Sequence, residues 1–170
     1  MKEDEMRKNV RDGYARIAKQ ELCCNASSSC NNSVLSEELS KKMGYTKEEL
    51  SSIPKGSNLG LGCGNPVALA SLKKGESVID LGSGTGVDCF LASKKVGRGG
   101  KVIGIDMTPE MLDKARENAQ EGNYQNVEFR LGEIEHLPVA DNIADVIISN
   151  CVINLTTNKK QVYEEAFRAL

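Results

Sequence analysis

The chain has 170 residues, of which 39% are hydrophobic and 27% are charged, and its 22 basic residues nearly balance 24 acidic ones. A chain of this length holds one domain with an extension, and a net charge of −2 argues against nucleic acid as the main partner. Met1–Glu5 is charged where a secretory signal needs an apolar core, and no apolar run approaches the roughly 20 residues that span a bilayer. We therefore expect a cytoplasmic protein without a membrane partner.

Six cysteines in 170 residues are too few for a disulfide scaffold. A reducing compartment keeps such thiols free for metal binding or chemistry, so the cysteines are candidate functional residues. Three of them fall in Cys23–Ser33, a stretch rich in Ser and Asn that predicts a mobile loop because it has almost no large apolar side chain.

The N-terminal part of the chain predicts helices. Met6, Val10, Tyr14 and Ile17 recur at helical spacing and predict an amphipathic helix. Further helical patterns cover Ser36–Met43 and Thr46–Ser51, before the glycine-rich segment LGLGCGNP at Leu59–Pro66, where the backbone can approach a ligand closely. We expect residues 1–72 to form a helical extension with a Cys-containing loop, and residues 73–170 to form an α/β domain.

From Glu76 onward, short apolar runs alternate with helical periods, which is typical of βαβ units and a parallel sheet. The pattern predicts a doubly wound, Rossmann-like sheet whose strand order reverses beside the first strand, with ligands bound at the carboxyl ends of the strands. Thr108 as N-cap, Pro109 and Gly122 mark the limits of one helix. The predicted strands are Ser77–Leu81, Lys101–Asp106, Val127–Leu131 and Ala144–Ser149, and the predicted helices are Val87–Val96, Pro109–Glu121 and Lys159–Leu170.

The segment DLGSGTG, residues 80–86, ends the first strand and opens a helix, as a nucleotide-binding loop must. Val87 stands where a dinucleotide fingerprint has its last glycine, and the Asp80 carboxylate would repel a pyrophosphate but attract the ammonium group of a methionine moiety. This combination favours S-adenosyl-L-methionine. A plain strand-to-helix turn and an NAD site remain the alternatives.

Two further strand ends complete the predicted cofactor site. Asp106 ends the second strand, where its carboxylate can accept both hydroxyls of a ribose, and Met107 can cover one face of an adenine. Glu133 and Ile134 follow the third strand and offer a polar and an apolar contact. The candidate cofactor-binding residues are Asp80, Gly82, Ser83, Gly84, Gly86, Asp106, Met107, Glu133, Ile134 and Asn150.

Several motifs stand in order along the chain: LGLGCGNP, VIDLGSGTG, GKVIGIDMTPEMLDKAREN, VEFRLGEIEHLPV and DVIISNCVINL. With them, the chain resembles the arsenite methyltransferases of microorganisms over about Asn58–Leu170. The resemblance implies a class I methyltransferase fold and S-adenosylmethionine-dependent methylation of trivalent arsenic, for arsenic detoxification. Members of that family continue with more strands and a C-terminal region that carries another arsenic-binding cysteine. We therefore expect this chain to be truncated, with an open edge at its fourth strand and poor turnover.

The resemblance also assigns Cys63 and Cys151 as catalytic, arsenic-binding thiols, and it implies a thiol reductant such as thioredoxin or glutathione. Cys30, in the predicted mobile loop, is a candidate third ligand. Thiolates suit a soft metalloid, whose lone pair can attack a sulfonium methyl without a general base. From the residues alone, Cys151 could be a core cysteine and Cys63 an exposed loop thiol. The roles of Cys23 and Cys24 stay open.

Other interpretations compete with this one. Zinc binding by the cysteine loop lacks the usual CxxC pairs, and the only histidine, His136, reads as a solvated loop residue without a role. Cys89 is most simply core packing. The alternative functions are a methyltransferase for another small molecule, which would usually need a base near the methyl group, and a non-catalytic thiol module that binds arsenite or a metal.

Overall fold

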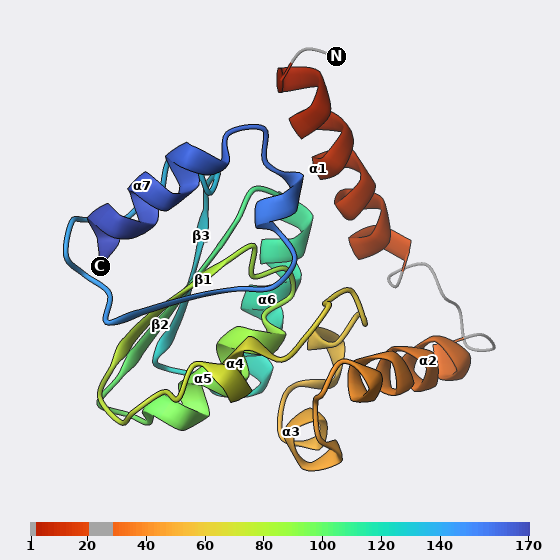
Figure 1. Ribbon diagram of the computed structural model, residues 1–170. Helices are drawn as coiled ribbons and strands as arrows, with labels where there is room; N and C mark the ends of the chain where they lie inside the picture. Colours follow the sequence, from red (N-terminus) through yellow and green to blue (C-terminus); the bar gives the residue numbers. More distant parts are fainter. Residues whose placement is uncertain (1–2, 21–28) are drawn as a thin grey trace.

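A computed structural model describes residues 3–20 and 29–170 of the chain (Figure 1). Its centre is a four-stranded sheet in the order β3-β2-β1-β4, in which each neighbouring pair is parallel. The order reverses beside β1, so the predicted doubly wound α/β fold is confirmed. The strands are β1 (Ser77–Leu81), β2 (Lys101–Asp106), β3 (Val127–Leu131) and β4 (Val146–Ser149).

Alternate side chains of each strand point to opposite faces of the sheet and pack in two separate apolar layers. Val78 and Val102 pack with Phe90 and Leu112 of the helices α5 (Val87–Val96) and α6 (Pro109–Glu121). The opposite-facing residues Ile79, Leu81, Ile103 and Ile105 pack with Val162 and Ala169 of α7 (Lys159–Ala169). Figure 1 shows α7 on one side of the sheet and α5 with α6 on the other.

The N-terminal elements lie against this domain. Helix α1 (Glu3–Gln20) contacts α6, and its Ala18 is buried. Tyr45, Ile53 and Val67 belong to the same buried cluster as α5. The division at residues 72 and 73 stays a prediction. The remaining elements are α2 (Ser29–Lys42), α3 (Lys47–Ser51), η2 (Lys55–Ser57), α4 (Pro66–Leu69) and η3 (Ile153–Leu155).

Some of the predicted helix and strand boundaries were wrong. Helix α2 begins at Ser29, so residues 29–33 are helical and not loop, because a helix extends from the sequence that follows even where Ser and Asn favour other conformations. Cys23 and Cys24 lie outside the described residues, and Cys30 lies within α2, but its side chain does not belong to the described part. Strand β4 begins two residues later than expected because the Ala144 N–H donates to the Ala169 carbonyl of α7 instead of to β1.

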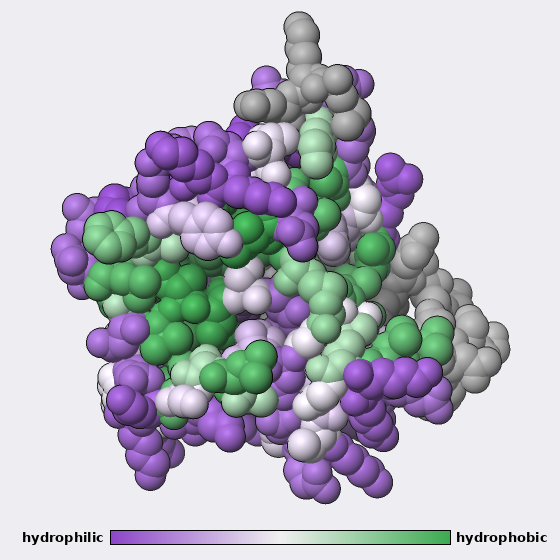
Figure 2. Space-filling model, in the orientation of Figure 1, coloured by the Kyte–Doolittle hydropathy of each residue, from purple (hydrophilic) through white to green (hydrophobic). Residues whose placement is uncertain are grey.

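Thr108 occupies the N-cap position of α6 without a capping bond from its side chain. Within residues 3–20 and 29–170, no helix has the length and apolar character needed to cross a membrane. Figure 2 shows apolar side chains gathered on the viewed face below α7, where β4 is the edge strand of the sheet.

Candidate active site

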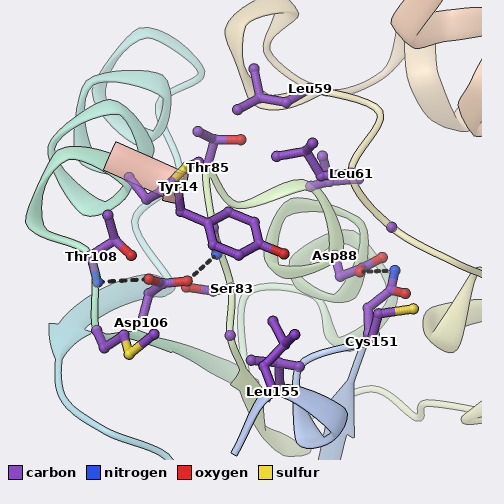
Figure 3. A pocket seen from close by; sticks show the side chains of 18 of the residues that line it. Tyr14, Leu59, Leu61, Ser83, Thr85, Asp88, Asp106, Thr108, Cys151 and Leu155 are labelled. Atoms are coloured by element: carbon purple, nitrogen blue, oxygen red, sulfur yellow. Dashed lines mark hydrogen bonds between the residues drawn. The ribbon is translucent and has the colours of Figure 1, made fainter. Parts of the chain in front are cut away.

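A cavity opens at the carboxyl ends of β1, β2 and β4, the edge at which ligands bind in sheets of this type. Figure 3 shows Asp106 and Asp88 on opposite sides of it, with Tyr14 reaching in from α1 and Cys151 beside Asp88. The cavity therefore gathers side chains from distant parts of the sequence. The predicted site residues that line it are Gly82, Ser83, Gly84, Asp106, Met107, Ile134, Asn150 and Cys151.

The glycine loop wraps around the end of β2. The N–H groups of Gly82 and Ser83 both donate to the Ile105 carbonyl, at 2.8 and 3.0 Å, and Gly82 has a φ of 75°. A Cβ atom on Gly82 would stand 2.6 Å from the Val152 side chain, so only glycine fits. The Ser83 hydroxyl is buried in this cavity without a hydrogen-bond partner among the described residues. Such an orphaned group is expected where a ligand completes the bonding.

Asp106 is held in a fixed orientation by backbone groups. Its Oδ2 accepts the N–H of Gly84 at 2.9 Å and its Oδ1 accepts the N–H of Thr108 at 2.8 Å (Figure 3). Burial raises the pKa of the Asp106 carboxyl, although these hydrogen bonds oppose the rise. Because each carboxylate oxygen has further lone pairs, the group can still accept hydroxyl donors from the cavity.

Asp80 lies beneath the cavity and does not line it. It is 2% exposed, and its Oδ2 accepts the Cys89 thiol at 3.3 Å. Burial and then the charge of Asp88 raise its pKa well above the ordinary value, and burial raises the pKa of Asp88 as well. Two buried carboxyl groups, Asp80 and Asp88, and the half-buried Asp106 thus share this edge of the sheet. Together they favour a cationic ligand and disfavour a pyrophosphate, by direct contact from Asp106 and Asp88 and at longer range from Asp80.

Helix α1 supplies a wall of the cavity that the sequence did not indicate. Arg7, Val10 and Tyr14 line the cavity, and the Arg7 guanidinium lies 3.6 Å from carboxylate oxygens of both Glu133 and Glu135. Glu135 lines the cavity, whereas Glu133 does not. The spacing of α1 predicted an apolar face, but nothing in the sequence showed which surface that face covers.

Gly86, the last glycine of the loop, also lies away from the cavity. It has a φ of 98°, and a Cβ atom there would stand 2.7 Å from the Phe90 ring. Its role is therefore to let α5 begin tightly against the sheet.

The structure joins Cys63 and Cys151 in a disulfide, with their Cα atoms 5.9 Å apart and 88 residues between them in sequence. Cys63 is exposed in the glycine-rich segment, and Cys151 is half-buried and lines the cavity. Cys151 has a φ of 63°, a left-handed conformation that costs a residue with a side chain about 1–2 kcal/mol. The surrounding contacts must hold that strain, which is typical of a functional position.

Among the cysteines whose side chains the structure describes, Cys89 is free, and it is buried as expected. No group of three or more His, Cys, Asp or Glu side chains suited to a metal ion occurs in the described part of the chain. His136 is exposed and does not line the cavity.

The fold and the glycine-loop cavity define a Rossmann-like domain of the methyltransferase class. A family model described as a methyltransferase domain matches residues 72–170, and the chain belongs to that family.

Among individual proteins, the chain is 48% identical to an arsenite methyltransferase of Halobacterium salinarum, over 98% of this chain and 45% of the relative. It is 32% identical to an arsenite methyltransferase of Mus musculus, again over 98% of this chain and 45% of the relative. A crystal structure of an arsenic (III) S-adenosylmethionine methyltransferase from Chlamydomonas reinhardtii superposes with a TM-score of 0.60 at 36% identity, covering 78% of this chain and 45% of that one. The resemblance seen in the motifs is confirmed, and the chain spans about half the length of these relatives.

Proposed function

We propose that this chain binds S-adenosyl-L-methionine in the cavity and trivalent arsenic through Cys63 and Cys151, as the catalytic part of an arsenite methyltransferase. The observation that carries the proposal is the meeting of these two thiols beside the glycine loop, where Cys151 lines the same cavity as Asp106. The similarity to arsenite methyltransferases over nearly the whole chain supports it.

The residues present fit this cofactor. The Asp106 carboxylate has acceptor capacity for ribose hydroxyls, and the unpartnered Ser83 hydroxyl offers a further polar contact. Met107 and Ile134 give apolar surface for an adenine, and the Asp88 and Asp80 carboxyl groups favour a ligand with positive charge. When bound, the cofactor supplies an electrophilic methyl group on a sulfonium sulfur.

The chain's own part in the reaction is to hold arsenic. Reaction of arsenous acid with two cysteine thiols forms two As–S bonds, and each thiol proton leaves with a hydroxyl group as water. Arsenic held in this way keeps its lone pair, so the two thiolates orient the nucleophile at the cavity. No histidine lines the cavity in the described ranges, and this chemistry needs no general base.

The disulfide between Cys63 and Cys151 must be reduced before arsenic can bind. Its opening takes two electrons and two protons, which a thiol reductant such as thioredoxin or glutathione supplies while it is itself oxidised to a disulfide. We therefore propose such a reductant as a partner. A cytoplasmic location follows as part of the proposal, because thiols stay reduced there.

Calorimetry tests the proposal. The reduced chain is titrated with S-adenosylmethionine in the presence and absence of arsenite, and the titrations are repeated on Cys63→Ser and Cys151→Ser. We expect cofactor affinity to change when arsenite is bound, and this coupling to disappear in both variants. Cofactor binding without any response to arsenite would reduce the function to a methyltransferase for another small molecule. Arsenite binding that ignores the cofactor would instead support a non-catalytic thiol module.

A further inference from the structure

The side chain of Asn150 bridges the two cysteine-bearing segments. Its Oδ1 accepts the backbone N–H of Cys63 at 2.9 Å, and its Nδ2 donates to the Gly64 carbonyl at 2.8 Å. Asn150 directly precedes Cys151 at the end of β4. Its amide group therefore hydrogen-bonds the backbone on both sides of the Cys63 side chain. These two hydrogen bonds span 86 and 87 residues of sequence.

Buried neighbours decide which way this amide points. Its Nδ2 also lies 3.1 Å from Asp88 Oδ2 and 3.1 Å from the Tyr45 hydroxyl, which itself donates to Asp88 Oδ1 at 2.7 Å. The Tyr45 hydroxyl donates its hydrogen to Asp88, so its oxygen can only accept from Asn150. The NH₂ group therefore faces Tyr45 and Asp88, and the carbonyl oxygen faces the Cys63 N–H, which can only donate. Figure 3 shows the bond that reaches Asp88 beside Cys151. The Tyr45–Asp88 pair therefore locks the amide in the orientation that holds the Cys63 segment.

Gly62 makes the close approach possible. A Cβ atom built on Gly62 would stand 2.7 Å from Asn150 Nδ2, so a side chain there would push the amide away from the segment. A Cβ atom on Gly64, on the other side of Cys63, meets nothing within 4 Å, and Gly64 does not have a positive φ. The two glycines that flank the same cysteine thus differ sharply in what an added methyl group would disturb.

We propose that Asn150 is a positioning residue that keeps the Cys63 thiol against Cys151 when the disulfide is open, with Tyr45 and Asp88 fixing its amide. Held in this way, the two thiols have a high effective concentration toward each other and toward any thiophilic atom that bridges them. The expectation that the held thiols bind arsenic more tightly rests on the proposed function. The expectation that they form their disulfide more readily does not.

The test measures how readily the two thiols form their disulfide. Cys23, Cys24 and Cys30 are replaced by Ser, so that Cys63 and Cys151 are the accessible pair. The chain is equilibrated with reduced and oxidised glutathione without cofactor, and the protein dithiol is quantified by thiol trapping. One protein disulfide and two glutathione thiols exchange with one protein dithiol and one glutathione disulfide, so the equilibrium constant is defined.

Asn150→Ala should shift this constant about tenfold toward the dithiol, since the loss of hydrogen bonds to both flanking peptides loosens the Cys63 segment. A tenfold change corresponds to about 30 mV. Gly62→Ala should move the constant in the same direction without removing a polar group, and it keeps the test valid if Asn150→Ala does not fold. Gly64→Ala is the matched control and should leave the constant as in the parent, because its carbonyl and the amide contact are kept.

A parent-like constant in folded Asn150→Ala, or equal effects of the two glycine variants, would overturn the proposal. Arsenite titration of the reduced proteins separates it from the proposed function. If the parent shows the expected shifts but binds no arsenite, the positioning role stands and the arsenic assignment fails. If arsenite binds the parent and Asn150→Ala equally well, the arsenic assignment stands and the positioning role fails.

Discussion

The two sides of the cavity are built in different ways. On the cofactor side, backbone N–H groups of the glycine loop donate to the Ile105 carbonyl and the Asp106 carboxylate at the neighbouring strand end, so the geometry follows from the register of β1 and β2. On the thiol side, the Cys63 segment meets β4 through one side chain and one disulfide across 87 and 88 residues. The cofactor side is therefore fixed by the sheet, whereas the thiol side depends on tertiary contacts and on redox state.

Oxidation should change arsenite binding far more than cofactor binding, and this is the largest difference we expect between the two sides. The chain with an intact Cys63–Cys151 disulfide should bind arsenite roughly two orders of magnitude or more weakly than the reduced chain. Two thiols held together bind a bridging atom that much more tightly than a single thiol does. Its S-adenosylmethionine affinity should change little, since Asp106 and the glycine loop keep their bonds. Calorimetry on the oxidised and phosphine-reduced forms measures both, and dithiol reductants are avoided because they bind arsenic themselves.

Cys151→Ser is the control for this comparison, because its arsenite affinity should be low in both redox states. Cys89→Ala should behave as the parent toward arsenite, since Cys89 is buried and donates to Asp80 instead of facing the cavity. Strong arsenite binding by the oxidised chain would show that other thiols hold the arsenic and would remove Cys63 and Cys151 from that role.

Replacement of Asp106 should act on the cofactor side alone. Asp106→Ala should weaken S-adenosylmethionine binding by about 1–3 kcal/mol, because hydrogen bonds to a charged acceptor are lost. It also leaves the N–H groups of Gly84 and Thr108 without their acceptor, so Asp106→Asn serves as a milder variant. Asp113→Ala, an exposed carboxylate on α6, is the control. Arsenite affinity measured in the same variants should stay at the parent value, and a matching loss there would mean that the two sides are not separate.

The same difference explains how much the sequence could predict. The strands β1, β2 and β3, the helices α5 and α6 and the loop at residues 80–86 follow from local periodicity and glycine spacing, and the structure has them at the expected places, whereas β4 begins two residues late. Asp80 shows the limit of that reasoning. Its position at a strand end was correctly read, but its side chain turns beneath the sheet edge toward Cys89 and is not in the cavity. Which face of a strand end a side chain takes depends on packing that the spacing does not contain.

Side-chain contacts between distant segments were harder still to predict from the sequence. Nothing in the sequence indicated that Tyr45 would bond Asp88 and Asn150, or that Arg7 on the first helix would reach Glu135. The segment LGLGCGNP predicted a close approach of the backbone to a ligand, which stays a prediction, and the structure shows Gly62 close to the Asn150 side chain instead. The contact with Asn150 was not indicated by the sequence.

Acidification should weaken the cofactor side by a smaller amount. Burial raises the pKa of the Asp80, Asp88 and Asp106 carboxyl groups above their ordinary value of 3.8, so protons compete for them as the pH falls toward their raised pKa values. A bound cation favours the ionised carboxylates. By linkage, the affinity for S-adenosylmethionine should therefore fall as the pH is lowered from neutrality toward those raised pKa values.

S-adenosylhomocysteine is the control ligand for this pH experiment, because it lacks the sulfonium charge but keeps the adenosine and the amino acid groups. Its affinity should fall less over the same range, so the ratio of the two affinities should decline with pH. A constant ratio would show that these carboxyl groups do not sense the sulfonium charge.

The smallest effect should come from the wall that α1 adds to the cofactor side. Arg7→Gln removes the ion pairs to Glu133 and Glu135 that tie α1 to the segment after β3, and its side chain is 26% exposed in the structure. Partly exposed ion pairs contribute up to about 1 kcal/mol, so S-adenosylmethionine should dissociate no more than about fivefold faster in a stopped-flow measurement. Arg16→Gln, an exposed arginine on the same helix, should dissociate the cofactor at the parent rate. Equal rates in all three proteins would show that α1 is not fastened over the bound cofactor by Arg7, and that the carboxyl ends of the strands retain it on their own.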